Sequence, residues 1–588
     1  MKGKRFPEGI LELITGVVTT SENLGPYESS IGVLLADRTK RFQSKPCFAE
    51  KRGGCYESTS WTTLWSQVQN IGAHFLELGL EPGDRVAVLS ENRGEMLLHD
   101  LAGMSAGLVV VPIFSGYFAE QVHFILNHAE PRVITVSYSG QFEKVRSWSG
   151  FEKTSRVYAM ETRDILMSDR VRPFSELMDP IDPAAFESRV AAQQPGHPCL
   201  IMYTSGTTGL PKGVVLTHKN ILSQQKGVSQ LWDVNEQDTF LSYLPWHHSF
   251  GGLFERFMAL YQGATLFLDD SRGKNISLML ENMKAVQPTV FFSVPKVYQA
   301  LVVEADHDAE IEHVIFHPRL RFVFTAAAPL SDEVSKVFER HGIPVHEGWG
   351  LTETSPDITL TRPGYHRVSG IVGWPIPGVE VQVAEDGEIL AKGPNIMKEY
   401  YRDPELTRQV MDQAGWFHTG DLGAWTDHGL RIVGRVDGIF KLSNAEKVCP
   451  DRIEKAALSA SRLILQCVAV GSGRDEVGLL MYLNWREVER RWKGLEAQQV
   501  VEHPDLHAQL SKDLLRANEE LEVKYERVNR FMVLTEELTL ERGELTPTMK
   551  VVRRKVLEHF QWAVQALYEH RSDLVNKNVV LILGAVKS

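Results

Sequence analysis

A chain of 588 residues is too long for one ordinary hydrophobic core, and about three to five domains or subdomains are expected. Its content of 43% hydrophobic and 23% charged residues is typical of a globular protein, and no apolar run is long enough to span a membrane. The formal net charge of −12 argues against a general nucleic-acid-binding protein. The five cysteines are odd in number and lack the spacing of a metal site, which indicates reduced thiols and a cytoplasmic protein.

Helical and strand-like segments alternate through the first part of the chain. Apolar residues recur at helical spacing from Leu64 to Leu78, and Gly79 follows as a C-cap. Residues 85–89 then form an apolar run with the length of a strand. Further strand-like runs lie at residues 108–113, 132–136, 239–245, 264–268, 289–295 and 321–329. This alternation predicts α/β layers with largely parallel sheets.

The sequence pattern changes twice in the second part of the chain. From about residue 371, glycine and proline turns separate short alternating runs, as in a meander or a small β-barrel. After about residue 436, charged helical stretches appear at 485–491 and 507–526. We therefore expect an N-terminal domain at 1–435, with α/β-layered subdomains and a small β-barrel-like subdomain, and a smaller α+β C-terminal domain at 436–588.

The stretch YTSGTTGLPKG, residues 203–213, lies between two strand-like runs at 198–203 and 214–217. Its small residues let backbone N–H groups approach an anion closely, and Lys212 adds a positive charge suited to phosphate. The spacing differs from that of the common P-loop. A flexible surface hairpin is the alternative, but the flanking strands and Lys212 favour a phosphate-binding loop.

Two further stretches place carboxylates beside glycine-containing turns. In HEGWGLTETSP, Thr352 and Glu353 follow a Gly-Trp-Gly turn and would suit Mg²⁺, while Trp349 could stack on a base. Taken alone, this stretch is better explained as a loop with a helix cap. In FHTGDLG, Asp421 in a tight turn could accept both hydroxyls of a ribose, although a turn-stabilising role is the simpler explanation.

Three other sets of residues have chemical potential but ordinary alternatives. Arg435 and Asp437 lie at the expected domain boundary, where a salt-bridged linker would explain them. His247 and His248 are adjacent and therefore poor ligands for one metal, so loop histidines are the alternative. Lys550 follows a Thr-Pro-Thr turn in a basic patch, where a solvated surface lysine would be usual.

The joint occurrence of these stretches, in this order, resembles the AMP-forming acyl-adenylating enzymes, which include acyl-CoA synthetases. The matching stretches are YTSGTTGLPKG, LPWHHSFGG, TAAAPL, GWGLTETSP, FHTGDLG, GRVDGIFKLSN and LTPTMK. KLSN, LTPTMK and the insertion between 485 and 526 are most similar to long-chain fatty acyl-CoA synthetases. Two positions depart from the usual pattern, because Glu399 and Ala445 stand where relatives often have glycine. A left-handed turn at Ala445 would be strained by its Cβ.

The resemblance implies that ATP and a fatty acid form an acyl-AMP, that CoA then accepts the acyl group, and that Mg²⁺ assists. By similarity, Lys550, Thr352 and Glu353 are catalytic, Glu353 and Thr204 bind Mg²⁺, His248 lies at the acyl-site entrance and Asp437 is the hinge of a mobile C-terminal domain. ATP or AMP would be bound by Thr204, Ser205, Gly206, Thr207, Thr208, Gly209, Lys212, Ala327, Ala328, Trp349, Gly350, Asp421 and Arg435.

Two alternative functions remain open at this stage. The acyl-adenylate could be transferred to an acyl carrier protein instead of CoA, or the chain could be a non-catalytic acyl- or nucleotide-binding protein. The second alternative is disfavoured because Lys550, Glu353 and Asp421 are all present. A peripheral contact with the inner face of a membrane would suit a fatty-acid enzyme, and a homodimer is also compatible with the sequence.

Overall fold

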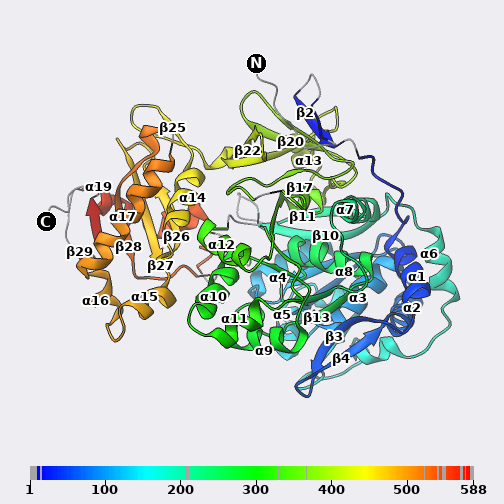
Figure 1. The fold of residues 1–588 in the computed structure, drawn as a ribbon. Coiled ribbons are helices and arrows are strands. Elements are labelled where there is room, and N and C mark those ends of the chain that lie inside the picture. Colours follow the sequence, from blue (N-terminus) through cyan, green and yellow to red (C-terminus); the bar gives the residue numbers. More distant parts are fainter. Residues whose placement is uncertain are drawn as a thin grey trace.

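The structure is a computed structural model, and it describes residues 10–12, 16–20, 22–205, 211–326, 330–365, 367–521, 523–539, 542–545, 551–569, 574–575 and 578–582. A large N-terminal part and a smaller C-terminal part lie beside each other, and both combine helices with strands (Figure 1). The predicted α/β class, with a large N-terminal domain followed by a smaller α+β C-terminal domain, is confirmed.

The first large sheet contains eight strands among the described residues. In spatial order they are β21 (Glu399–Tyr400), β11 (Pro211–Thr217), β10 (Pro198–Ser205), β6 (Val109–Phe114), β5 (Arg85–Ser90), β7 (Val133–Val136), β8 (Arg156–Ala159) and β9 (Val171–Pro173). The strands from β10 to β9 are parallel, whereas β11 and β21 add antiparallel strands at one edge. Both faces are therefore covered, as parallel sheets require.

The second large sheet contains nine strands in the same described ranges. Their order is β18 (Trp374–Pro375), β17 (Asp357–Leu360), β16 (Val345–Gly350), β15 (Phe322–Thr325), β14 (Val290–Ser293), β12 (Thr239–Ser242), β13 (Thr265–Leu268), β3 (Pro46–Arg52) and β4 (Cys55–Ser60). The strands from β16 to β3 are parallel, as the alternation of apolar runs predicts.

Helix α3 (Gly94–Ser105) lies between the two large sheets, where it contacts β5, β6 and β3. Its residues are buried except Glu95, and the buried charge of Asp100 is paired with Arg256 at 2.7 Å. Helix α2 (Trp61–Glu77) packs beside it and ends just before Gly79, whose φ of +73° suits the predicted C-cap. The other helices of this part are α1 (Ile31–Phe42), α4 (Ala119–Ala129), α5 (Ser139–Arg146), α6 (Ala184–Ala192), α7 (His218–Leu231), α8 (Arg256–Gln262), α9 (Ile276–Val286), α10 (Pro295–Ala305), α11 (Ala309–Ile315), α12 (Asp332–Arg340) and α13 (Pro404–Val410).

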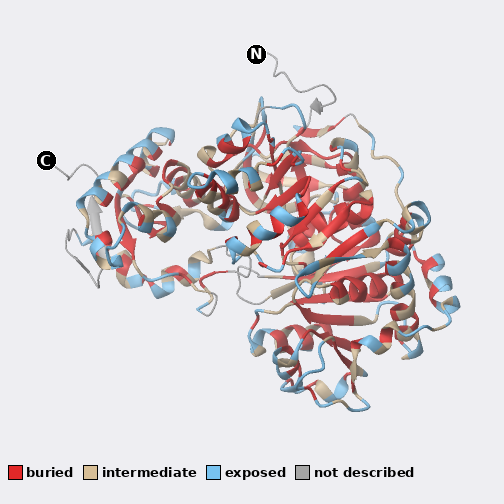
Figure 2. Cartoon of the chain, turned by 60° about the horizontal axis from the view of Figure 1, so that its bottom comes forward, coloured by how far each residue is buried: buried red, intermediate tan, exposed pale blue. Residues whose placement is uncertain are grey.

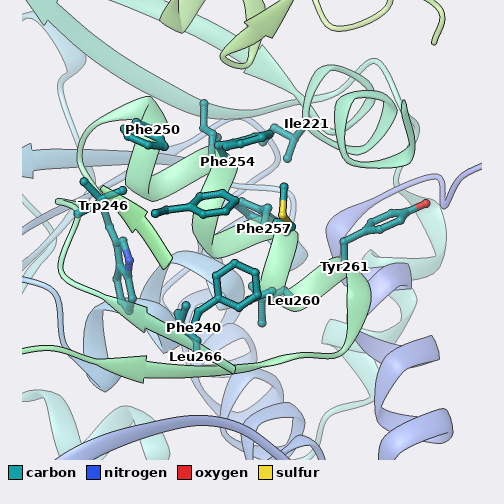
Figure 3. Close-up of a cluster of buried hydrophobic side chains, with 14 of the residues drawn as sticks. Ile221, Phe240, Trp246, Phe250, Phe254, Phe257, Leu260, Tyr261 and Leu266 are labelled. Atoms are coloured by element: carbon teal, nitrogen blue, oxygen red, sulfur yellow. The ribbon is translucent and has the colours of Figure 1, made fainter. Parts of the chain in front are cut away.

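An aromatic cluster lies between the second sheet and the segment that begins at Phe250, and Figure 3 labels three of its members, Phe240, Phe250 and Phe254. We define it as Trp232, Phe240, Phe250, Phe254, Phe292 and Phe324, and no member is more than 5% exposed. The rings of Phe292 and Phe324 lie 4.9 Å apart, and Phe254 lies 5.1 Å from Phe324. Phe250 and Phe254 belong to a π-helical segment, Phe250–Glu255, that leads into α8.

A smaller antiparallel sheet follows, and it accounts for the predicted meander. It runs in the order β1 (Ile10–Glu12), β2 (Val17–Thr20), β19 (Glu380–Val383), β20 (Glu388–Lys392), β22 (Phe417–Thr426) and β23 (Gly429–Arg435).

Two segments predicted as turns are strands. Asp421 lies within β22 and pairs with Arg435 of β23, and buried residues alternate with less buried ones from Phe417 to Gly423. Trp349 and Gly350 are the last residues of β16, where the pairing with β17 shifts register. Glycine-rich sequence accommodates a bulge within β22, and at Gly350 the bulge coincides with the end of β16.

The C-terminal part has its own sheet with helices on both faces. The strand order is β26 (Ile464–Val470), β27 (Val477–Leu483), β28 (Val528–Leu534), β30 (Asn578–Ile582) and β29 (Leu574–Val575). Helices α14 (Pro450–Ala460) and α17 (Pro504–Glu520) share one hydrophobic core with it, and α18 (Arg553–His559) and α19 (Gln561–Tyr568) share another. Buried residues follow these strands through both parts of the molecule (Figure 2). The helix predicted at 507–526 ends at Glu520, and Lys524–Glu526 forms a separate 3₁₀ turn. The remaining elements are α15 (Trp485–Arg491), α16 (Ala497–Val501), β24 (Phe440–Lys441) and β25 (Lys447–Val448).

Ion pairs connect the two parts where they meet. Arg462 contacts Glu333 of α12 at 2.7 Å and Asp306 at 3.3 Å. Arg490 of α15 contacts Glu304 of α10 at 3.1 Å. These side chains are about one-third exposed, so their contribution to stability is modest.

Candidate active site

The β10–β11 hairpin carries the predicted phosphate-binding loop at its end. Thr204 and Lys212 are direct partners in the antiparallel pairing, so the two strands present them together. The intervening residues Gly206, Thr207, Thr208 and Gly209 lie outside the described residues, and only the backbone of Ser205 is described. The phosphate-binding role of this loop stays a prediction.

Tyr400 connects this hairpin to the predicted metal ligand. Its hydroxyl donates to Oε1 of Glu353 at 2.6 Å, and the Nζ atom of Lys212 lies 5.4 Å from the centre of its ring. Glu353 is 9% exposed and belongs to the 3₁₀ turn Thr352–Thr354, which follows β16. Burial, followed by the charge of Glu353, raises the pKa of Tyr400 well above its usual value, while Arg435 opposes this shift.

Thr352 connects the same turn to the LPWHHSFGG segment. Its hydroxyl donates to Oγ of Ser249 at 3.2 Å, and both side chains are buried. His248 precedes Ser249 and is half-buried, and its Nδ1 accepts from the backbone N–H of Phe250 at 3.3 Å. The LPWHHSFGG segment thus contacts the turn Thr352–Thr354 through Ser249 and enters the aromatic cluster at the next residue, Phe250. A role of His248 at an acyl entrance stays a prediction.

Trp349, Asp421 and Arg435 form a second polar group beside the first. The indole N–H of Trp349 donates to Oδ2 of Asp421 at 2.9 Å, and Arg435 contacts Oδ1 at 3.0 Å. Asp421 is 7% exposed, and its backbone N–H donates to the Thr419 hydroxyl, which holds the main chain at this position. Gly350 next to Trp349 has a steric requirement, because a Cβ there would collide with the carbonyl oxygen of Pro356.

Arg435 also reaches the predicted hinge. Its Nε donates to Asp437 at 3.2 Å, and its backbone N–H donates to Asp451 of α14 at 2.9 Å. The core residues of the N-terminal part end at Leu430 and those of the C-terminal part begin at Leu442, on either side of this contact.

Three further predicted site residues lie outside the described part of the chain, in addition to those of the phosphate-binding loop. These residues are Ala327, Ala328 and Lys550. Their neighbours are described, since Leu545 and Val551 pair across the Lys550 segment and β15 ends two residues before Ala327.

Sequence reasoning missed Tyr400 and Ser249, which connect the predicted residues to one another. Tyr400 lies in the Glu-Tyr-Tyr stretch, in which the sequence pattern drew attention only to Glu399. Glu399 is exposed on the edge strand β21. Ser249 lies between His248 and Phe250, where no pattern distinguishes it. Ala445 adopts a φ of +68°, so the expected left-handed turn is formed despite its Cβ.

The donors around Glu353 fit a magnesium ion held largely by substrate phosphates. Among the described residues no group of three or more His, Cys, Asp and Glu side chains could hold a metal by itself. Mg²⁺ commonly uses one or two carboxylates together with phosphate oxygens and water, so the carboxylate of Glu353 and the nearby threonine hydroxyls are a suitable partial set.

A cavity of about 820 Å³ lies elsewhere, between α12 and the helices of the C-terminal part. It is lined by charged side chains such as Lys336 and Lys512, and no predicted site residue contributes to it. The candidate site is therefore defined by two sets of contacts rather than by this cavity. One set joins Lys212, Tyr400 and Glu353, and the other joins Asp421 to Trp349 and Arg435.

Two models of known protein families match the chain. The family model described as AMP-binding enzyme matches residues 35–401, and the model described as AMP-binding enzyme C-terminal domain matches residues 437–572. The chain belongs to the AMP-binding enzyme family. The first match ends just after Tyr400 and the second begins at Asp437.

Individual relatives of this AMP-binding enzyme are similar over most of their length. Long-chain-fatty-acid–CoA ligase FadD15 of Mycobacterium bovis is 29% identical, over 88% of this chain and 93% of its own. Long-chain-fatty-acid–CoA ligase 1 of Cavia porcellus is 26% identical, over 89% of this chain and 84% of its own. The anthranilate CoA ligase AuaEII, solved with anthranoyl-AMP, shares the fold with a TM-score of 0.77 at 20% identity, over 92% of this chain and 99% of its own.

No helix in the described part of this AMP-binding enzyme has both the length and the apolar character needed to cross a bilayer.

Proposed function

We propose that this chain is an ATP-dependent ligase that converts a long-chain fatty acid into its CoA thioester through an acyl-AMP intermediate. The observation that supports this most directly is the set of contacts joining Lys212, Tyr400, Glu353 and Thr352, with Trp349, Asp421 and Arg435 beside them. These residues come from five distant stretches, and an adenylating site needs all of their chemistries in one place. The names of the curated relatives supply the substrate class.

The proposed first half-reaction joins two anions, so the site must neutralise phosphate charge and hold the reactants in line. The fatty-acid carboxylate attacks the α-phosphate, an acyl-phosphate bond forms and pyrophosphate leaves. Lys212 and the loop 204–209 would hold the β- and γ-phosphates, Thr352 would contact the α-phosphate, and Lys550 would stabilise the developing charge. A bound Mg²⁺ ion would supply further charge neutralisation, with Glu353 and Thr204 as its protein ligands.

The proposed nucleoside contacts use the second polar group. Asp421 and Arg435 would bind the ribose hydroxyls, and the bonds from Trp349 and Arg435 already orient the Asp421 carboxylate. Trp349, Gly350, Ala327 and Ala328 would line the adenine. This assignment places the nucleoside on the β16 and β22 side and the triphosphate on the β10–β11 side.

In the proposed second half-reaction the CoA thiol attacks the acyl carbonyl, a thioester forms and AMP leaves. We propose domains at 1–435 and 436–588, with Asp437 as the hinge that lets the C-terminal domain withdraw Lys550. The contact of Arg435 with both Asp437 and Asp451 supports a hinge at this point.

Transfer to an acyl carrier protein is the alternative fate of the adenylate. The curated relatives are named as CoA ligases, which favours CoA. We further propose a cytoplasmic enzyme. Sedimentation with lipid vesicles would test a peripheral membrane contact, and light scattering would test a homodimer.

The proposal is tested by ATP–pyrophosphate exchange with a panel of carboxylic acids, from acetate to long-chain fatty acids and including aryl acids. We expect long-chain fatty acids to give the fastest exchange, and CoA to release the corresponding thioester. Exchange with aryl or short acids alone would overturn the substrate class. Exchange without thioester formation, restored by a carrier protein, would overturn the acceptor.

A further inference from the structure

Tyr400 has a position that neither the family match nor the predicted site explains. It is 5% exposed, yet its hydroxyl and its ring each contact a different charged residue of the proposed site. We propose that Tyr400 is a positioning residue that orients the Glu353 carboxylate for a divalent cation and aligns Lys212 with it. The inference rests on the proposed function, because it assigns Glu353 and Lys212 to the metal–triphosphate complex.

Backbone contacts hold Tyr400 rigidly in this position. Its strand, β21, pairs with β11 opposite Val214, two residues from Lys212. Its own N–H donates to the Thr407 hydroxyl at 3.0 Å, and the N–H of Met397 donates to the carbonyl oxygen of Glu353 at 2.7 Å. The segment that carries Tyr400 is therefore bound both to the hairpin and to the turn of Glu353. A side chain fixed on rigid elements is a suitable orienting group.

The chemistry of the phenol suits this task better than a cation would. A neutral donor fixes Oε1 of Glu353 and leaves the negative charge of the carboxylate available to a metal ion. An arginine in the same place would neutralise that charge. A phenol hydroxyl is protonated at neutral pH and can therefore act as the donor in this bond.

Residues that orient a metal ligand without touching the metal commonly change metal affinity by about ten-fold or more when they are removed. Removing the Tyr400 hydroxyl is therefore expected to lower the affinity for the cation and to leave the packing of the fold unchanged. Replacement by phenylalanine keeps the ring against Lys212 and removes only the hydroxyl, so the two contacts of Tyr400 are separable.

The neighbouring Tyr401 offers a matched control. It is only half-buried, and its ring lies 5.5 Å from that of His128 and 5.3 Å from the guanidinium of Arg402. Tyr401→Phe removes the same atom from the adjacent position, without removing the bond to Glu353.

The test uses the full-length chain and two readouts. Mn²⁺ binding is measured by electron paramagnetic resonance in the presence of ATP without any acid, and Mg²⁺ activation is measured by ATP–pyrophosphate exchange. For Tyr400→Phe we expect Mn²⁺ affinity to fall about ten-fold and the Mg²⁺ concentration for half-maximal exchange to rise similarly, with most of the rate recovered at saturating Mg²⁺. Tyr401→Phe should match the unmodified chain in both.

A double-mutant cycle with Glu353→Gln provides a further test. If Tyr400 acts through Glu353, Tyr400→Phe should change Mn²⁺ affinity little when Gln already occupies position 353. Equal effects in both backgrounds would overturn the proposal. So would an unchanged Mn²⁺ affinity in Tyr400→Phe, or a lower exchange rate at every Mg²⁺ concentration with the same half-maximal value.

The outcomes also distinguish this inference from the proposed function. If the unmodified chain activates no acid but Tyr400→Phe still weakens Mn²⁺ binding with ATP, the function fails and the positioning role holds. If the unmodified chain activates fatty acids and the two tyrosine variants behave alike, the function holds and the positioning role fails.

Discussion

Two regions on either side of the Ser249–Thr352 hydrogen bond are built in opposite ways. The polar region, which contains Lys212, Tyr400, Glu353 and Asp421, depends on a few directed contacts between distant parts of the chain. The aromatic cluster depends on many undirected ring contacts between neighbouring strands and one helical segment. Removing one donor or acceptor atom abolishes a directed contact. In a packed cluster, the loss of stability instead grows with the side-chain volume that a substitution removes. The two regions should therefore respond differently to substitution.

The largest effect is expected in the aromatic cluster. Phe254→Ala removes a ring with no exposed surface and should lower the free energy of unfolding by about 3–5 kcal/mol. Thermal unfolding measures the loss, and Phe118→Ala is the control because Phe118 is 51% exposed. If both variants unfolded at the same temperature, the cluster would not be the stabilising region.

The proposed catalytic lysine should affect activity instead of stability. Lys550→Ala is expected to lower the rate of acyl-AMP formation by about 10²–10³, the scale of one lost contact to a developing oxyanion. ATP binding and the unfolding temperature should change little, which calorimetry and thermal unfolding would check. Acyl-AMP formation at the normal rate would contradict the assignment of Lys550.

Acid should lower the free energy of unfolding through His346, whose ring stacks on that of Trp232 in the aromatic cluster with 5.3 Å between ring centres. Burial lowers the pKa of His346 to about 4 in the folded state. Between pH 6.5, its ordinary pKa, and pH 4, the unfolded chain therefore binds a proton at this residue and the folded chain does not. Stability should therefore be full above pH 6.5 and decline as the pH falls from 6.5 towards 4, by on the order of 1 kcal/mol at pH 5.5.

Thermal unfolding at pH 7.5 and pH 5.5 measures this decline. His346→Gln, which cannot titrate, should show a smaller difference between the two pH values. An identical difference in both chains would show that other groups cause the acid sensitivity.

The smallest effect is expected at the boundary between the regions. Ser249→Ala removes the acceptor of the Thr352 hydroxyl and should lower the free energy of unfolding by about 1 kcal/mol, with a less than ten-fold fall in adenylation. Exchange kinetics and thermal unfolding together test this. A fall as large as that of Lys550→Ala would show that Ser249 takes part directly in the reaction.

The sequence predicts the structure of the aromatic cluster better than that of the polar region. Runs such as Val290–Ser293 and Phe322–Thr325 are apolar over the length of a buried strand, so their burial follows from local pattern. The bond from Tyr400 to Glu353 joins residues 47 positions apart, and no local pattern specifies it. Asp421 and Trp349 were predicted in turns because glycine usually indicates one, but strand pairing overrode that preference.

The ion pairs of Arg462 and Arg490 have a consequence for how the two parts of the molecule can separate. These pairs are already partly exposed to solvent, so breaking them exchanges protein contacts for water contacts. A contact made by such ion pairs would suit the proposed withdrawal of the C-terminal domain. It should also loosen as ionic strength rises, because dissolved ions compete for the same side chains.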